Sequence, residues 1–365
     1  IWIELAERVG HMLVLGTTRV GKTRFAEIMI TQDIRRGDCV IVFDPKGDAD
    51  LLLRMYAEAK RAGRLDQFYM FHLGFPEFSA RYNPLGNFGK ITEVATRIAS
   101  ALPGEGQSAT FREFVWRYVN VIARALDALG IKPSYEEVYR RTNSIDGLCV
   151  SYFEFWLDRD APAWRDHFVE GELSRSDKTL GELARKTGRS MRALELSAFI
   201  RGQGLRDAVG EALFTILSND KTYFEKLVAS LYPLLEKLTT GHISQLLSPN
   251  YDDAHDPRPV INWTRVIETG GIVYFGLDAL TDHMVAGAVG GAAFSDLTSV
   301  AGHFYKHGQG SGQSAAPAFQ RKTCLHADEF NELIGDDFIP MVNKAGGAGY
   351  QVTAYTQTWS DVEAR

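Results

Sequence analysis

Apolar runs alternate with amphipathic stretches over the first quarter of the chain. Residues 12–15 form a short apolar run, and 24–36 carry apolar side chains at helical spacing. Residues 38–43 are nearly all β-branched or apolar, as expected for a strand covered on both faces. We expect another helix over 50–62 and a third strand over 67–74. Strands that alternate with helices predict a parallel α/β sheet.

From about Glu93 the strand pattern gives way to helical spacing. We predict helices over 111–129, from 134 onward, and one or two over 214–238, with the apolar stretch 148–157 as an exception. Three tryptophans stand at helical spacing, which favours a hydrophobic core over a platform that stacks bases: Trp116, Trp156 and Trp164.

The strand pattern returns at 271–277, followed by a glycine-containing helix that we expect to pack closely against the sheet. Residues 323–329 and 350–355 predict two more strands. The predicted domain limits are 1–103 and 256–365 for the two parts of an α/β domain, and 104–255 for an inserted all-α domain.

The loop between the first strand and helix carries a strong chemical signal. It fits G-x-x-x-x-G-K-[ST] without a mismatch: Gly16, Thr17, Thr18, Arg19, Val20, Gly21, Lys22 and Thr23. Backbone N–H groups of such a loop wrap around phosphate oxygens, and the following helix directs its positive end at them. Lys22 is expected to reach the β- and γ-phosphates, and the Thr23 hydroxyl to ligate Mg²⁺. ATP and Mg²⁺ are the predicted cofactors.

Two carboxylates stand at the carboxyl end of the predicted strand 323–329. Asp328 is expected to hold Mg²⁺, usually through water, and Glu329 to accept a proton from the water that attacks the γ-phosphate. Gln357 follows the neighbouring predicted strand, where it fits a γ-phosphate sensor. The predicted catalytic residues are thus Lys22, Glu329 and Gln357, in a RecA-like P-loop ATPase sheet flanked by helices.

A polar turn, Asp44-Pro45-Lys46-Gly47-Asp48, ends the strand 38–43. Polar residues at the carboxyl end of a buried strand lie where open α/β sheets bind ligands. The same residues would also suit a turn that caps the next helix. Both interpretations stay open, and they do not exclude each other.

The segment 175–206 is the most basic stretch of the chain. Its cations are Arg175, Lys178, Arg185, Lys186, Arg189, Arg192, Arg201 and Arg206. A solvated helix face explains such a run, and contact with a phosphate backbone is the alternative.

Length and composition limit the function classes. With 365 residues, 45% hydrophobic and 24% charged, the chain resembles an ordinary globular protein, and no stretch approaches the apolar length of a membrane span. The net charge of −6 gives no general attraction to nucleic acid but does not exclude a local basic channel. Three distant cysteines favour buried thiols over a disulfide or metal site. We expect a fragment of a longer protein, with any membrane anchor outside it.

Five segments together resemble the type IV coupling proteins of bacterial conjugation, in particular the TraD/TraG kind carried by integrative conjugative elements. They are GTTRVGKT at 16–23, VIVFDPKGDADL at 40–51, RYNPL at 81–85, CLHADEFNEL at 324–333 and YQVTAYTQTWSD at 350–361. The first and fourth occur in many ATPases. The second and fifth, in this order and around a helical insertion, are more specific.

This resemblance implies a RecA-like nucleotide-binding domain interrupted by an all-α domain. It further implies a hexameric, ATP-driven DNA pump at the cytoplasmic face of the bacterial inner membrane. Such a pump links DNA bound by the relaxase, within the relaxosome, to a type IV secretion channel. By position, Lys22, Thr23, Asp328, Glu329 and Gln357 become the phosphate, magnesium, catalytic and sensor residues.

One position departs from the family. Relatives place an arginine shortly before the last core strand, where it reaches a neighbouring subunit's nucleotide, but here Val342 is followed by Asn343-Lys344-Ala345-Gly346. Lys344 is a candidate replacement that lacks the fork geometry of arginine. The trans-acting residue is therefore left unassigned.

Two other functions fit parts of the pattern. A DNA translocase similar to FtsK or HerA shares the motor, but the long helical insertion argues against it. A receptor that binds ATP structurally and docks protein cargo would not require Glu329. We therefore predict the motor fragment of a conjugative coupling protein, in which ATP hydrolysis drives DNA and relaxase into the channel.

Overall fold

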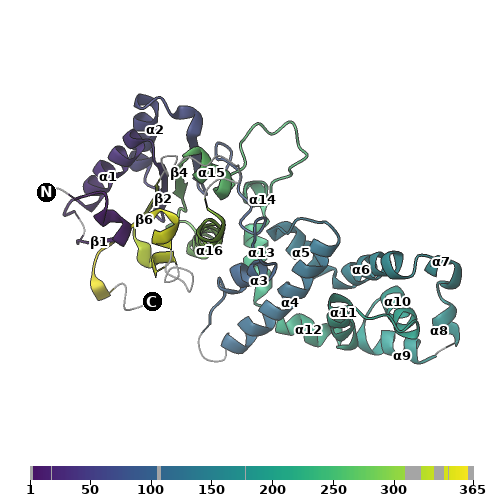
Figure 1. Cartoon of the computed structure of the whole chain (residues 1–365). Coiled ribbons are helices and arrows are strands. Elements are labelled where there is room, and N and C mark those ends of the chain that lie inside the picture. The colour runs from purple at the N-terminus through teal and green to yellow at the C-terminus, as the bar shows by residue number, and fades with distance from the viewer. Residues whose placement is uncertain are drawn as a thin grey trace. The chain divides into compact units, whose positions relative to one another are not determined.

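The computed structural model describes residues 3–17, 19–104, 108–176, 178–308, 322–332, 341–343 and 345–360. Thr18 and Lys344, both named from the sequence, lie outside the described residues. The chain divides into two compact units (Figure 1). One, the sheet unit, consists of Ile1–Gly89 and Leu238–Arg365, and the other, the helical unit, is Lys90–Lys237.

The helical unit starts and ends earlier than the predicted insertion, 104–255. It starts earlier because α3 (Thr92–Ala99) packs against α4 (Ser108–Ala128). It ends earlier because the chain after Leu238 pairs with the sheet unit. There the N–H of Tyr82 donates to the carbonyl of Leu246 at 2.8 Å.

Within the described residues, six parallel strands form the sheet, in the order β1-β6-β5-β2-β4-β3. They are β1 (Met12–Leu15), β2 (Cys39–Asp44), β3 (Phe68–His72), β4 (Ile272–Gly276), β5 (Thr323–Ala327) and β6 (Tyr350–Thr356). Each agrees closely with a strand predicted from the sequence. The last strand, β6, lies between β1 and β5. All six carboxyl ends therefore meet at one edge.

Helices cover both faces of the sheet. The main ones are α1 (Lys22–Arg36), α2 (Ala49–Arg61), α15 (Trp263–Thr269) and α16 (His283–His307), with the shorter α14 (Gly241–Leu247) nearby in the chain. On one face, α1 and α2 pack against Val40 and Tyr274. On the other, Trp263 and Phe294 lie with ring centroids 6.4 and 5.8 Å from that of Phe43. The result is a three-layer α/β sandwich, which confirms the predicted fold class.

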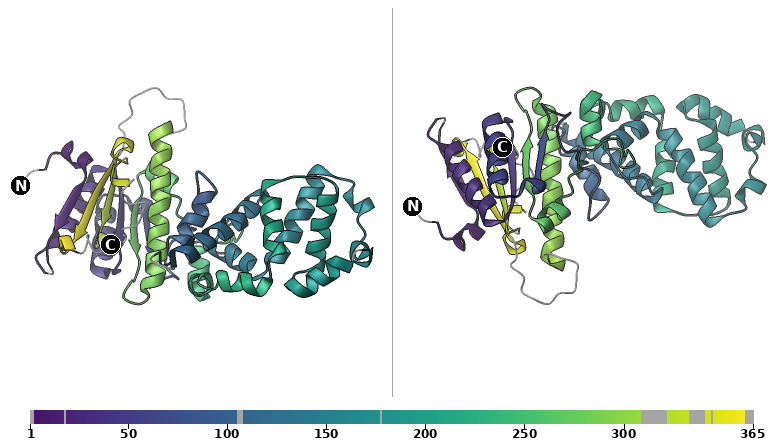
Figure 2. Two further views of the ribbon diagram at one scale, coloured as in Figure 1. Left: turned by 90° about the horizontal axis from the view of Figure 1, so that it is seen from below. Right: turned by 90° about the horizontal axis from the view of Figure 1, so that it is seen from above.

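The helix α16, light green in Figure 2, is long and apolar enough to cross a membrane by length and composition alone. The hydrophobic pattern of the sequence predicts no such segment. However, 67% of its apolar window is buried inside the protein, as in the core helix of a globular domain. Gly287 and Gly291 do not contribute to this burial, because a Cβ on either would meet no atom within 4 Å. The expected close packing through glycine is wrong at these two positions.

The described part of the helical unit is built from helices. After α3 and α4 come α5 (Tyr135–Asn143), α6 (Ile145–Asp160), α7 (Trp164–His167), α8 (Glu172–Ser176), α9 (Lys178–Thr187), α10 (Met191–Gly202), α11 (Ala208–Ser218), α12 (Lys221–Leu227) and α13 (Leu231–Leu238). Trp156 and Trp164 are buried, as predicted. Trp116 is only partly buried, and its indole N–H donates to Thr96 Oγ1 at 3.0 Å.

Two segments of the helical unit differ from the sequence prediction. The stretch 148–157 lies inside α6, because its buried positions, such as Leu148, Tyr152 and Trp156, recur every four residues. The region 214–238 holds parts of three helices rather than one or two. The first of them starts at Ala208, because the Asp207 side chain accepts N–H groups of the first helical turn and caps it.

Candidate active site

The carboxyl ends of neighbouring strands bring the predicted site residues together. Leu15 at the end of β1 pairs with Thr356 of β6, whose neighbour β5 ends at Ala327, opposite Phe43 of β2. A pocket of about 300 Å³ opens at these ends. It is lined by Thr17, Arg19, Gly21, Lys22, Thr23, Arg24, Lys46, Asp328, Glu329 and Gln357. All residues predicted as catalytic or metal-binding line this one pocket.

The loop after β1 is shaped for close approach of a ligand. A Cβ on Gly16 would lie 2.7 Å from Val20 Cγ2 and 3.2 Å from Lys22 Cγ, so a larger residue there would force these side chains to move. Gly21, with φ +99°, is the N-cap residue of α1, and no side chain of the described residues caps this helix. The first N–H groups of α1 therefore face the pocket at the positive end of the helix, as an anion site requires. Gly16 and Val20 shape the loop without lining the pocket.

A tight turn after β5 presents Asp328 and Glu329. The N–H of Asp328 donates to the carbonyl of Phe43 at 3.0 Å, and the N–H of Glu329 donates to Asp328 Oδ1 at 3.1 Å. Glu329 has φ +40°, in the left-handed region that residues other than glycine rarely adopt. This backbone holds two consecutive carboxyl groups at the same pocket.

Two donors meet at one oxygen of Glu329. Lys46 Nζ forms an ion pair with Glu329 Oε1, and Gln357 Nε2 donates to the same oxygen at 3.2 Å. The sequence places Lys46 in a polar turn but does not assign it to the site. The signal that could have found it is its position at the carboxyl end of a buried strand, where such sheets bind ligands.

The polar turn after β2 does cap the next helix. Asp44 accepts the N–H groups of Lys46, Gly47 and Asp48, and the side chain of Asp48 in turn accepts the N–H of Asp50 at the start of α2. The same turn brings the Lys46 side chain to the pocket. The two interpretations of this turn are thus compatible.

The pKa of the Asp328 carboxyl is strongly shifted. Burial, followed by the charges of Asp44 and Glu329, raises the pKa of Asp328 from 3.8 to about 6, although Lys46 acts in the opposite direction. The charge of Asp44 contributes to this rise in pKa because the residue is only 1% exposed, so that water does not screen its charge. A carboxylate that lies among other carboxylates gains from a bound cation, so the pocket fits a divalent metal ion with oxygen ligands.

Replacing Asp328 by asparagine should raise thermal stability at about pH 8 and leave it unchanged near pH 4. A carboxyl whose pKa rises on folding stabilises the fold fully below its unfolded pKa, and this contribution is lost as the pH rises through the folded value of about 6. The neutral amide avoids that loss, which we expect to be about 1 to 3 kcal/mol.

Thermal unfolding in Mg²⁺-free buffer at the two pH values measures this effect. Asp66→Asn, which removes an exposed carboxylate of the same unit, should show no comparable gain. Equal melting temperatures for wild type and Asp328→Asn at the higher pH would contradict the prediction.

A buried ion network lies behind the pocket. Asp33 of α1, fully buried, accepts hydrogen bonds from Arg8 at 2.5 and 2.9 Å and from Arg36 at 2.5 Å. His326 Nε2 lies 2.9 Å from Asp33 Oδ2, and His326 Nδ1 lies 3.0 Å from the hydroxyl of Tyr355. The network thus joins the phosphate-loop helix to β5 and β6, the strands that carry the acidic pair and Gln357.

The same network explains why two buried carboxylates lie beside a cysteine. Asp38 lies with Asp33 and Cys324 in a buried cluster whose geometry would suit a metal ion. Arg36, however, forms ion pairs with both carboxylates, so arginine supplies the positive charge there. The thiols of Cys39, Cys149 and Cys324 are all buried, in agreement with the predicted core positions.

The basic stretch of the helical unit is partly occupied by internal contacts. Arg189 is buried and pairs with Asp146, and Arg192 pairs with Glu154 and Glu170. These two cations are structural.

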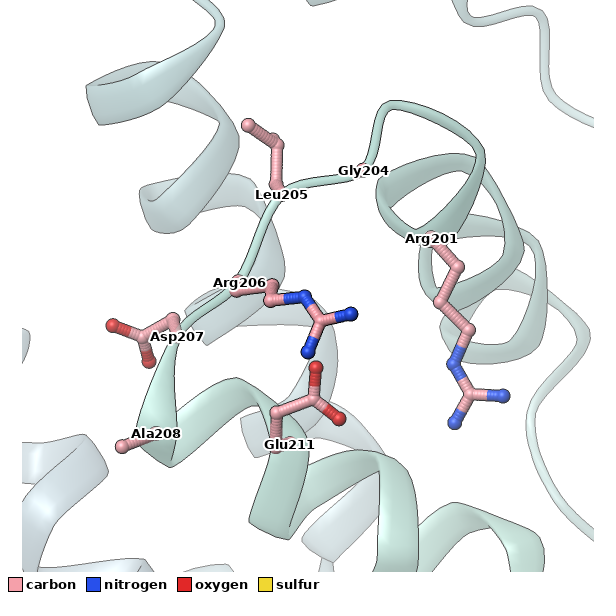
Figure 3. A pocket seen from close by; sticks show the side chains of 7 residues that line it. All are labelled: Arg201, Gly204, Leu205, Arg206, Asp207, Ala208 and Glu211. Atoms are coloured by element: carbon pink, nitrogen blue, oxygen red, sulfur yellow. The ribbon is translucent and has the colours of Figure 1, made fainter.

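A depression of about 510 Å³ lies at the end of the basic stretch (Figure 3). There the guanidinium of Arg206 points toward the carboxylate of Glu211, and Arg201 lies over the ring of Phe214, 4.6 Å from its centroid. Contact of these residues with a phosphate backbone stays a hypothesis.

Sequence comparison identifies no relative. No protein-family model matches the chain, and no curated protein matches it by sequence.

Structure comparison finds the fold. The bacterial conjugative coupling protein TrwBdeltaN70, in its unbound monoclinic form, is 16% identical with a TM-score of 0.51. The match covers 98% of this chain and 64% of that one, so this chain spans less than two thirds of the coupling protein. VirB4 of Thermoanaerobacter pseudethanolicus is 15% identical, with a TM-score of 0.45 and coverage of 97% of this chain and 71% of that one. The chain has a P-loop NTPase fold, a parallel sheet flanked by helices, and it shares this fold with a conjugative coupling protein.

Proposed function

We propose that this chain is an ATP-hydrolysing motor of type IV secretion and, more specifically, the motor part of a TraD/TraG-type conjugative coupling protein. The observation that carries the proposal is the convergence of Lys22, Thr23, Asp328, Glu329 and Gln357 on one pocket. Fold similarity to a conjugative coupling protein supports it. Its substrate in this proposal is DNA bound to a relaxase, delivered to a type IV secretion channel.

Each pocket residue has a role in this proposal. Lys22 and the N–H groups of the loop bind the phosphates, since they lie at the positive end of α1. Thr23 and Asp328 would hold Mg²⁺, which neutralises charge on the transferred phosphoryl group when it is bound. Glu329 accepts the proton of the attacking water, and Gln357 detects the γ-phosphate.

The proposal also covers the oligomeric state of the protein and its location in the cell. The active form is a homohexamer with a site between subunits, anchored at the cytoplasmic face of the inner membrane by a segment outside this sequence. The cation that reaches a neighbouring subunit's nucleotide is unassigned, and Lys344 is its candidate. DNA is bound without sequence specificity, with 175–206 as a candidate contact region.

Comparison of Lys22→Ala with the wild type tests this function. Loss of the lysine should weaken binding of Mg²⁺·ATP by about tenfold to a hundredfold, because it removes charge-assisted hydrogen bonds to phosphate. ATP turnover should be measured for both proteins with and without single- and double-stranded DNA, while light scattering follows the oligomer mass. Lys60→Met, which removes an exposed lysine of α2, is the control and should match the wild type.

The outcomes separate the candidate functions. Turnover that DNA stimulates, that rises with assembly and that falls in Lys22→Ala supports a DNA motor. ATP binding without turnover, in a species that stays monomeric with DNA, would favour an ATP-binding receptor that docks protein cargo. Equal nucleotide affinity of Lys22→Ala and the wild type would refute the phosphate site.

A further inference from the structure

Lys46 is the pocket residue whose contacts the proposed roles leave unexplained. Its side chain is 51% exposed, yet its ammonium group pairs with Glu329 rather than pointing into water. Gln357 donates to the same oxygen of Glu329. The proposed proton acceptor is therefore engaged by two donors in the structure.

This engagement opposes the proposed role of Glu329. A carboxylate oxygen accepts a proton from water only if water can reach one of its lone pairs. On Glu329 Oε1 that space is occupied by the ammonium group of Lys46 and the amide of Gln357. The main chain of Glu329 lies in a tight turn with a positive φ, so the carboxylate is not expected to be released by a backbone shift. Movement of the two donor side chains would release it.

Lys46 is well suited to such movement. Its backbone is fixed, because its N–H donates to Asp44 Oδ1 at 3.0 Å. Its four-carbon side chain is flexible and half exposed, so the ammonium group can change partners while the main chain stays in place. The ammonium stays charged, since burial acts to lower the pKa of Lys46 but Glu329, Asp328 and Asp44 together raise it above its usual value.

The γ-phosphate of ATP is an anion that would compete with Glu329 for these donors in the same pocket. Lys22 and Lys46 both line it, together with Gln357. The γ-phosphate of ATP carries more negative charge than one carboxylate, and ADP lacks that group. A bound nucleoside triphosphate would therefore compete with Glu329 for both donors, whereas ADP has no phosphate group at the γ-position.

We propose that Lys46 is a positioning residue with two alternative partners: Glu329 when no γ-phosphate is present, and the γ-phosphate when ATP is bound. This rests on the proposed function and deepens it. Glu329 is held in an inactive arrangement until the nucleotide that it acts on has entered. Lys46 thereby distinguishes ATP from ADP and couples this distinction to release of the base.

A double-mutant cycle on nucleotide affinity tests the switch without relying on turnover. The proteins are wild type, Lys46→Met, Glu329→Gln and the double variant, and the ligands are Mg²⁺ with β,γ-imido-ATP or ADP, measured by calorimetry. Lys46→Met should weaken triphosphate binding about threefold to tenfold, the range of a partly exposed ion pair. Glu329→Gln should tighten triphosphate binding by a similar factor, because it frees Lys46. Affinity for ADP should be unchanged in all four proteins.

The sign of the coupling decides between two explanations. If Glu329 competes for Lys46, the gain from Glu329→Gln is smaller in the Lys46→Met background than in the wild type. If Lys46 merely screens repulsion between Glu329 and the γ-phosphate, Glu329→Gln tightens triphosphate binding more in the Lys46→Met background than in the wild type. This result would overturn the switch.

Control variants separate failure of the Lys46 switch from failure of the nucleotide site itself. Lys46→Arg should preserve most of the preference for triphosphate over ADP, whereas Lys60→Met should change nothing. Additive effects, or equal losses for ADP and triphosphate, would refute the role of Lys46 alone. Failure of the wild type to bind either nucleotide would refute the nucleotide site itself.

Discussion

Glu329→Gln should lower the rate of ATP hydrolysis by about 10²- to 10⁴-fold, the usual contribution of a general base, while nucleotide binding persists. Glutamine has the same size and keeps the hydrogen bond from Gln357, but it cannot take a proton from water. The turn geometry should survive, because it depends on backbone contacts of Asp328 and Glu329. Steady-state phosphate release at saturating Mg²⁺·ATP measures the effect.

A matched variant controls for loss of charge at this edge of the sheet. Glu77→Gln removes an exposed carboxylate in the loop after β3 and should hydrolyse ATP at the wild-type rate. Unchanged turnover in Glu329→Gln would show that another group is the base. A parallel loss of ATP binding would instead point to collapse of the turn.

Asp33→Ala should destabilise the sheet unit by about 3 to 5 kcal/mol, because removal of one partner leaves the other buried charge uncompensated. Arg8 is 4% exposed and its guanidinium donates two hydrogen bonds to Asp33, so it cannot turn to water instead. His326 loses the same partner. Chemical denaturation followed by circular dichroism measures the change.

Glu58→Ala is the control for Asp33→Ala. Glu58 is also buried, but its partners Arg35 and Arg61 have side chains 59% and 65% exposed, so they remain solvated without it. We expect a loss of about 1 kcal/mol or less there. Similar losses for the two variants would show that burial of the carboxylate, and not isolation of its partner, sets the cost.

The pH dependence of Asp33→Ala has a defined sign. Burial acts to raise the pKa of Asp33, but hydrogen bonds from Arg8 and His326 outweigh it and hold this pKa well below its usual range. The stabilisation by Asp33 is therefore present above its unfolded pKa of about 4 and is lost as the pH falls toward the folded value. The difference between wild type and variant should shrink in acid.

The strands and the phosphate loop could be predicted because their signals are local. β2 is a nearly unbroken apolar run, and the loop from Gly16 to Thr23 has fixed spacing. The placement of Asp328 and Gln357 at the same pocket could also be expected, since parallel strands end at one edge. Pattern and spacing suffice where neighbours in the sequence are neighbours in space.

Long-range contacts were beyond the reach of such patterns. The contact of Lys46 with Glu329 joins residues that are far apart in the sequence, and it depends on the strand order β5-β2, which no local pattern states. The limits of the helical unit were misplaced for the same reason, since the pairing of Tyr82 with Leu246 leaves no periodic signal. The stretch 148–157 was misread because its apolar run obscured a helical spacing.

The position of β6 between β1 and β5 bears on how the protein is synthesised. Within the described residues, β6 is the sheet neighbour of β1, so the strand that leads into the phosphate loop stays without its partner until almost all of this sequence has left the ribosome. The helical unit, continuous in the chain and held by nearby helices, can form earlier. Nascent chains halted before Tyr350 should therefore display a folded helical unit beside an unfinished sheet, and such chains would depend on chaperones.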